Sequence, residues 1–116
     1  MKRNMDLARQ ILLEIEKQPF TNAYIEFNNI GDYTTEEISY HVMILGEAEL
    51  LVPVHTFGTY WETTRLTWEG HEFLAAARDD TRWKKACSMM LEKGGDIALG
   101  VLKQLLLHLM MGELGL

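Results

Sequence analysis

Hydrophobic residues recur at helical spacing twice in the N-terminal half of the chain. Residues 5–17 carry one apolar stripe, which predicts an amphipathic helix with Asn4 as its N-cap and Pro19 as its stop. A second stripe follows Thr34. Thr34 and Glu37 have the spacing of a capping box, in which a hydroxyl and a carboxylate each bind a free backbone N–H. The predicted buried positions of the two helices are Ala8, Ile11, Leu12, Ile15, Ile38, His41, Val42 and Leu45.

Apolar and polar residues alternate in three short segments. Residues 23–27 predict a short strand, and residues 50–56 and 60–67 predict the two strands of a hairpin around Gly58. Thr67 then provides an N-cap for a further helix, which the pattern extends to residue 78. The predicted buried side of that helix consists of Trp68, Phe73, Leu74 and Ala77.

The last third of the chain has the pattern of two more helices. Asp79 and Asp80 separate a helix over 81–92 from the preceding one, and Asp96 is a candidate cap for a helix over 97–111. This last segment is apolar on most of its circumference, whereas a surface helix needs only one apolar stripe. We therefore expect it to be covered on two sides, by its own chain or in a dimer. The candidate packing or dimer residues are Leu99, Leu102, Leu106, Leu109 and Met110.

The predicted order of helix, short strand, helix, two-strand ribbon and helix is that of a winged helix. The stretch ISYHVMILGEAELL (38–51) resembles the recognition-helix region of bacterial winged-helix regulators. The stretch LTWEGHEFL (66–74) resembles the point where the second wing strand enters the next helix. The whole chain resembles an uncharacterised family of prophage-associated proteins and is similar to the YjcQ-like winged-helix proteins.

The resemblance implies an α+β fold. Residues 1–93 are expected to form a winged-helix domain with a helix, a short strand, a second helix and a two-strand wing, followed by additional helical structure. Residues 94–116 are expected to form a C-terminal apolar helix. Regulators of this kind place glycine before the first wing strand, where the backbone is left-handed, but this chain has Glu49 there.

Charge separates the possible partners. The formal net charge is −6, and residues 21–60 contain six acidic residues and no Lys or Arg. Because phosphate neutralisation supplies most non-specific affinity for nucleic acid, DNA binding is disfavoured. An acidic helix face with Tyr and Met is more typical of a protein contact. The candidate partner-contact face is Glu36, Tyr40, Met43 and Glu47, and the candidate phosphate contacts, if DNA is bound, are Arg65, Lys84 and Lys85.

Motifs for catalysis, cofactors or metals are not found in the sequence. The four His residues do not share ligand spacing with one another, and the single Cys87 lies in an apolar stripe, where an inert thiol is expected. A single cysteine and the lack of an apolar run long enough to cross a bilayer favour a cytoplasmic protein without membrane contact.

The sequence therefore predicts a non-enzymatic interaction module of phage or prophage type. It is expected to act through contacts with a partner protein or with itself, with a homodimer as the expected assembly and no cofactor. The alternative is a DNA-binding transcriptional regulator. An electrostatic map of the folded surface and a DNA-binding assay at low salt distinguish the two hypotheses.

Overall fold

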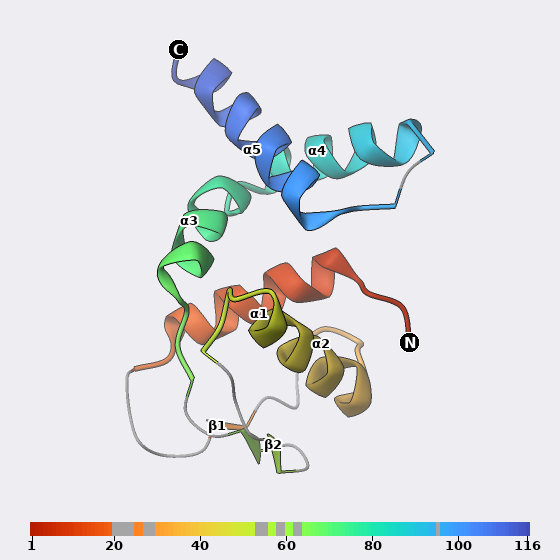
Figure 1. The fold of residues 1–116 in the computed structure, drawn as a ribbon, viewed down its shortest axis with the longest axis vertical. Helices are drawn as coiled ribbons and strands as arrows, with labels where there is room; N and C mark the ends of the chain where they lie inside the picture. The colour runs from red at the N-terminus through yellow and green to blue at the C-terminus, as the bar shows by residue number, and fades with distance from the viewer. Residues whose placement is uncertain (20–24, 27–29, 53–55, 58–59, 62–63, 95) are drawn as a thin grey trace. The chain divides into compact units, whose positions relative to one another are not determined.

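The computed structural model describes residues 1–19, 25–26, 30–52, 56–57, 60–61, 64–94 and 96–116. The chain forms two compact units, Met1–His71 and Glu72–Leu116. The elements labelled in Figure 1 are, in chain order, α1 (Met5–Lys17), β1 (Ile25–Glu26), α2 (Thr35–Glu47), β2 (Thr56–Phe57), β3 (Tyr60–Trp61), α3 (Trp68–Ala77), α4 (Asp80–Glu92) and α5 (Leu99–Glu113).

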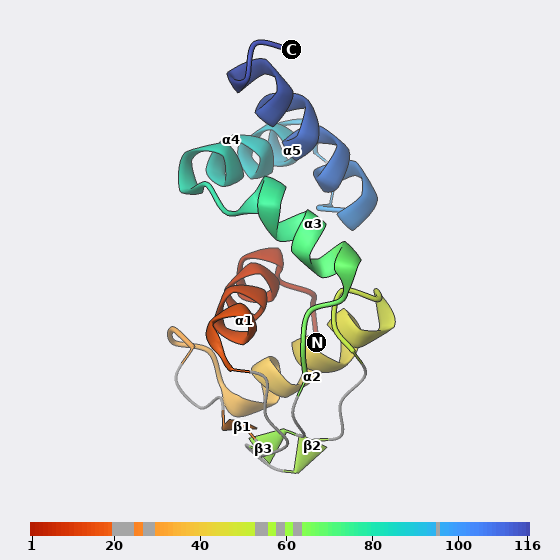
Figure 2. The same ribbon diagram turned by 90° about the vertical axis from the view of Figure 1, so that its left-hand side faces the viewer.

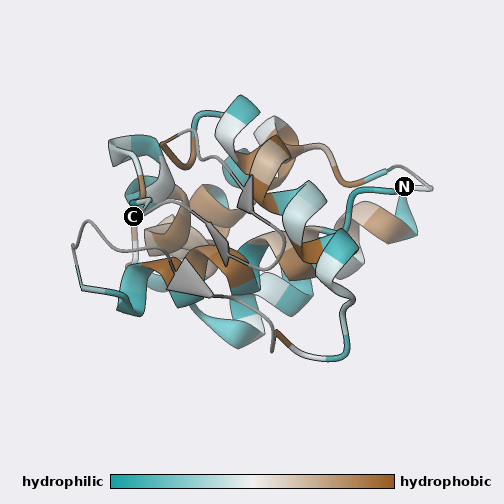
Figure 3. Ribbon diagram, turned by 90° about the horizontal axis from the view of Figure 1, so that it is seen from below, coloured by the Kyte–Doolittle hydropathy of each residue, from teal (hydrophilic) through white to brown (hydrophobic). Residues whose placement is uncertain are grey.

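Helices α1 and α2 pack against each other in the first unit. Both N-terminal caps are confirmed: the Asn4 side chain accepts a hydrogen bond from the Leu7 N–H, and Thr34 and Glu37 form the full capping box. All eight predicted buried positions of the two helices are buried. Figure 3 shows how hydrophobic and hydrophilic residues alternate along the helices, which is the pattern that predicted them.

His41 links the start of α1 to α2 in the interior of the first unit. Its side chain is 1% exposed, and its Nε2 accepts a hydrogen bond from the Asn4 N–H at 2.7 Å. Its Nδ1 lies 2.7 Å from the Glu37 carbonyl oxygen, to which it donates in the neutral ring. Both ring nitrogens therefore have backbone partners, as a buried polar side chain requires, and His41 has a structural role.

The three strands form an antiparallel sheet in the order β1-β3-β2. In the register of the sheet, Ile25 pairs with Trp61, and Phe57 pairs with Tyr60. An isolated bridge joins Leu51 and Leu66. The predicted strand over 23–27 is thus found as β1, and its other residues lie outside the described part of the chain.

The prediction of an α+β winged helix is wrong. Each helix has 10–15 residues, whereas each strand has two, so the described residues form an α-helical fold. Residues 53–55 and 62–63 of the wing predicted over 50–56 and 60–67 lie outside the described part of the chain. At the start of the predicted wing, the N–H groups of Leu50 and Leu51 both donate to the Leu45 carbonyl at the end of α2, so they are not available to a strand partner. Beside them, the Thr67 N–H donates to the Leu50 carbonyl and the Val52 N–H donates to the Arg65 carbonyl.

The second unit contains the C-terminal part of α3 together with α4 and α5. Helices α4 and α5 pack against each other, as both Figure 1 and Figure 2 show. Phe73 on α3 and Trp83 on α4 are buried and meet edge to face, with ring centroids 6.2 Å apart. On α5 the buried residues are Leu102 and Leu106, one helical turn apart.

The boundaries of the last two helices differ slightly from the prediction. Helix α4 begins at Asp80, and the Asp79 side chain caps it by accepting a hydrogen bond from the Arg82 N–H. The predicted cap of α5 is wrong. Its N-cap is Ala98, which makes no side-chain hydrogen bond, whereas the Asp96 carboxylate accepts from the neighbouring Ile97 N–H.

The predicted domain boundary at residue 93 lies within the second compact unit, and the domain assignment itself stays a prediction. Among the described residues, the helices are all too short or too polar to cross a membrane.

Candidate functional site

The junction between α2 and α3 is held by a closed set of backbone hydrogen bonds. The Leu50 N–H donates to the Leu45 carbonyl and the Glu49 N–H donates to the Gly46 carbonyl, each at 3.1 Å. This pair of bonds is a Schellman motif, in which the residue after the C-cap is left-handed and is usually glycine. Glu49 occupies that position with φ of 63°, so the left-handed residue expected before residue 50 is confirmed.

Thr67 joins the end of α2 to the start of α3. Its hydroxyl donates to the Glu49 carbonyl at 2.5 Å and accepts from the Gly70 N–H at 3.0 Å, which confirms Thr67 as the helix cap. Gly70 lies against the backbone of Leu50, because a Cβ added there would lie 2.2 Å from the Leu50 carbonyl oxygen. The junction is therefore fixed in one geometry by hydrogen bonding and by close packing of the backbone.

A recess of about 540 Å³ lies at this junction. We call it the Trp68 recess. It is lined by Gly46, Glu47, Glu49, Leu51, Val52, Thr67, Trp68 and Glu69, all of which belong to the first unit.

The prediction that Trp68 is buried is wrong, because its side chain is 76% exposed. Phe73, Leu74 and Ala77 are buried as predicted. At roughly 100° per residue, a helix turns by about half a circle, net, between Trp68 and Ala77, so the two side chains point to opposite faces. The angle between these positions was thus the signal in the sequence that distinguishes Trp68 from the buried side.

The Trp68 recess is acidic. Glu47, Glu49 and Glu69 are exposed, and the described lining residues include no Lys or Arg. Glu47 lies in the last turn of α2, which contains no basic residue, although the helix dipole favours a cation at that end. The carbonyl ends of α2 and the carboxylates therefore add to the same negative potential. Glu69, in the first turn of α3, is placed favourably for the dipole of its own helix.

The predicted partner-contact face lies on α2. Glu36, Met43 and Glu47 are exposed, and Tyr40 is half-buried with its ring edge to face against His41, the centroids 5.7 Å apart. Glu47 belongs both to this face and to the Trp68 recess. Whether the face binds a partner stays a prediction.

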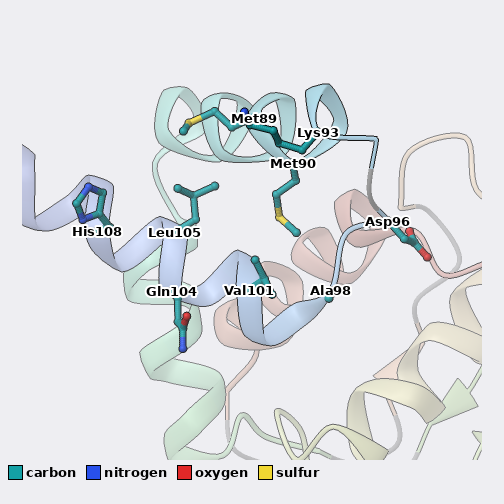
Figure 4. A pocket seen from close by; sticks show the side chains of 9 residues that line it. All are labelled: Met89, Met90, Lys93, Asp96, Ala98, Val101, Gln104, Leu105 and His108. Atoms are coloured by element: carbon teal, nitrogen blue, oxygen red, sulfur yellow. The ribbon is translucent and has the colours of Figure 1, made fainter.

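A second candidate surface is an apolar groove of about 610 Å³ between α4 and α5. Met90 of α4 and Val101 and Leu105 of α5 point into the space between the two helices (Figure 4). Val101 is nevertheless 57% exposed, so the groove is open to solvent. We call it the α4–α5 groove, and its full lining is Met89, Met90, Lys93, Asp96, Ala98, Val101, Gln104, Leu105 and His108.

The five α5 residues predicted for packing or dimerisation do not share one environment. Leu102 and Leu106 are buried, whereas Leu99, Leu109 and Met110 are half-buried. The sequence analysis did not select Val101 and Met111, which are more exposed. The hydrophobic pattern of a helix that is apolar nearly all round does not reveal which side its own chain covers.

An ion pair connects the elements of the second unit. The guanidinium of Arg82 on α4 donates to the Glu113 carboxylate of α5, with Nη2 and Oε2 2.6 Å apart, and its Nη1 donates to the Ala76 carbonyl at 2.9 Å. The hydrogen bond to Glu113 is the main cause that raises the pKa of Arg82, partly opposed by desolvation. The Arg82 side chain is 11% exposed, and its hydrogen bonds hold the guanidinium in one position between α4, α5 and the Ala76 carbonyl.

The candidate phosphate contacts lie in both compact units. Arg65, Lys84 and Lys85 are exposed; Arg65 belongs to the first unit, where its Nη1 donates to the Leu66 carbonyl, and the two lysines belong to the second. Within the described residues, His, Cys, Asp and Glu side chains do not gather in groups of three or more that could hold a metal ion.

The described residues define a small α-helical protein that has an acidic recess and an apolar groove among its surfaces. The chain belongs to the DUF2513 family of hypothetical proteins, whose model matches residues 2–96. A protein of Haemophilus influenzae, described as uncharacterized, is 33% identical over 108 residues, which cover 90% of this chain and 91% of that protein. No solved structure matches the chain.

Proposed function

We propose that this protein is an interaction module that associates with a second copy of itself through the α4–α5 groove. The observation that carries the proposal is the groove itself, an open apolar recess of about 610 Å³ on a helix pair. Apolar side chains that remain exposed over a contiguous surface mark protein contacts. The exposed apolar residues of the second unit are Met89, Leu91, Val101, Met111, Leu114 and Leu116.

A second copy is the favoured occupant because the second unit carries both the groove and apolar residues to fill one. Met111 and Leu114 at the end of α5 are 49% and 68% exposed, outside the groove lining. In a two-fold dimer each chain offers the same patch to the other. The end of α5 from each chain would then pack in the α4–α5 groove of the other chain, which gives two equivalent contacts. The seven methionines of the chain, two of them in the lining, also suit an adaptable contact surface.

The test is the mass of the protein in solution over a concentration series, measured by light scattering. Dimers are expected for the parent protein, and Val101→Glu is expected to shift it to monomers, because the substitution places a charge in the apolar groove. Ser88→Glu is the matched control, since it adds the same charge at an exposed position of α4 outside the groove lining. A parent protein that is monomeric at every concentration would contradict the proposal.

The remaining parts of the proposal rest on the sequence. We propose a non-enzymatic role and a cytoplasmic location. The single cysteine supports the cytoplasmic location. A role in phage or prophage biology stays a prediction from the resemblance. The alternative, a DNA-binding regulator, is opposed by the acidic residues of α2 and its junction, so we expect no appreciable binding to duplex DNA at physiological salt.

A further inference from the structure

Three features of the Trp68 recess depart from the usual preferences of a stable protein surface. The Trp68 indole is 76% exposed, Glu47 lies at the helix end that repels anions, and Glu49 holds a left-handed backbone that glycine would adopt at lower cost. Local rules of stability are broken most often at functional sites, where another interaction compensates for them. The convergence of three such exceptions on one recess indicates a binding site.

We propose that the Trp68 recess binds a basic segment of a partner protein, with an arginine or lysine side chain lying on the Trp68 indole. This surface is separate from the α4–α5 groove and does not depend on self-association. The recess volume of about 540 Å³ lies within the range of roughly 300–1,000 Å³ that is usual for ligand pockets.

Charge decides the type of partner. An anionic ligand would be repelled by Glu47, Glu49 and Glu69, and an apolar segment would have to remove water from their carboxylates. A cationic side chain is attracted by all three carboxylates and by the carbonyl end of α2. It also gains a cation–π interaction with the indole face, for which tryptophan is the best partner.

The shape of the site favours a side chain presented by a protein over a free small molecule. Small ligands are usually bound with most of their surface buried, but an indole that is 76% exposed covers only one side of its partner. The stem of an arginine or lysine side chain is apolar and can pack on the half-buried Val52, while its charged end stays near the carboxylates.

The junction is rigid enough to serve as such a site. The Thr67 hydroxyl and the close approach of Gly70 to Leu50 fix the start of α3, and with it the backbone of Trp68 and Glu69. A preformed site loses less conformational entropy when it binds its partner. Weak, salt-sensitive binding with fast association is therefore expected, because the charges are exposed.

The experiment is an NMR titration of the intact protein with a blocked pentapeptide of alternating alanine and arginine. The indole N–H signal of Trp68, assigned by its loss in Trp68→Phe, is expected to move as the peptide is added. The same peptide with citrulline in place of arginine is expected to bind on the order of tenfold more weakly, because it keeps the shape and loses the charge. An unmoved Trp68 signal, or equal binding of the citrulline peptide, would overturn the proposal.

Two variants and a matched control locate the site. Trp68→Ala and Glu49→Gln are each expected to weaken peptide binding about two- to fivefold, through loss of the cation–π contact and of one charge pair. Asp32→Asn removes one negative charge from the exposed turn before α2, outside the recess, and is expected to change binding less than about twofold. Equal weakening by Asp32→Asn and Glu49→Gln would show general charge attraction in place of a site.

A third probe tests the class of partner, and one further variant separates this proposal from self-association. Spermidine is expected to bind more weakly than the arginine peptide, because it cannot stack a planar cation on the indole. Tighter binding of spermidine would overturn a protein partner in favour of a small amine. Val101→Glu is expected to leave peptide binding unchanged, so the two proposals can fail separately.

Discussion

The Trp68 recess and the α4–α5 groove differ in the charge and polarity of the side chains that line them. At the α2–α3 junction a braced backbone presents one exposed indole among three carboxylates. Between α4 and α5 two packed helices present methionine, valine and leucine side chains, and the two charged lining residues, Lys93 and Asp96, have opposite signs. The first arrangement selects a partner by charge and geometry, whereas the second is adaptable and gains affinity from the burial of apolar surface.

The largest contrast in stability is expected between Trp68 and Trp83. Trp83 is 3% exposed and packs against Phe73 in the second unit, so Trp83→Ala is expected to lower the free energy of unfolding by about 3–5 kcal/mol. Trp68→Ala is expected to change it by less than about 0.5 kcal/mol, as is usual for a surface substitution. Urea unfolding of both variants measures the difference, and equal losses would show that Trp68 belongs to the core.

The brace of the junction is tested by Gly70→Ala. The added Cβ would lie 2.2 Å from the Leu50 carbonyl oxygen, a backbone atom that cannot move without opening the junction. We expect a loss of about 3 kcal/mol in the free energy of unfolding, at the upper end of overpacking effects. Gly100→Ala is the control, because its Cβ would meet nothing within 4 Å and alanine favours the helix by about 1 kcal/mol. Losses of equal size at both positions would contradict the close approach.

In the second unit the corresponding strut is Arg82. Arg82→Ala removes the hydrogen bonds to Glu113 and to the Ala76 carbonyl, with an expected loss of about 1–2 kcal/mol. Because the pKa of Arg82 is raised, the guanidinium stays charged and its contribution is present at neutral pH; it is lost only as the pH rises through that pKa. Thermal unfolding at neutral pH measures the change. Unaltered stability would show that the strut makes no net contribution.

A small gain in stability is expected for Glu49→Gly, which separates the effect of Glu49 on folding from its effect on binding. Glu49→Gly is expected to raise the free energy of unfolding by about 1 kcal/mol, since glycine adopts the φ of 63° without the strain that a side chain adds. If the Trp68 recess binds a basic segment, the same substitution weakens the binding of the arginine peptide. A variant that is less stable than the parent would show that the Glu49 side chain has a stabilising contact.

Local signals predicted the elements well and their assembly poorly. The stripe at Ala8, Ile11 and Ile15 and the capping box at Thr34 identify α1 and α2, because periodicity and caps act within a few residues. The wing was predicted from alternation over 50–67 and from the order of elements. Strand formation depends on partners across the sheet, and here the N–H groups of Leu50 and Leu51 bind the Leu45 carbonyl at the end of α2 instead of a strand partner.

The candidate sites show the same limit. Glu47 was predicted as a contact residue because it lies on an acidic helix face with Tyr40 and Met43, and it also lines the Trp68 recess. Trp68 was assigned to the apolar stripe of its helix together with Phe73, Leu74 and Ala77, although its helical angle relative to Ala77 places it on the other face. The α4–α5 groove depends on how two helices cross, which the sequence of each helix does not specify.

If the α4–α5 groove binds a second copy and the Trp68 recess serves a different partner, self-association depends on the groove and not on Trp68. Sedimentation velocity on Val101→Glu and Trp68→Ala, side by side with the parent protein, tests it most directly. The account predicts dimers for the parent and for Trp68→Ala, and monomers for Val101→Glu. Monomers for Trp68→Ala with dimers for Val101→Glu would contradict it, because the dimer contact would then lie at the α2–α3 junction.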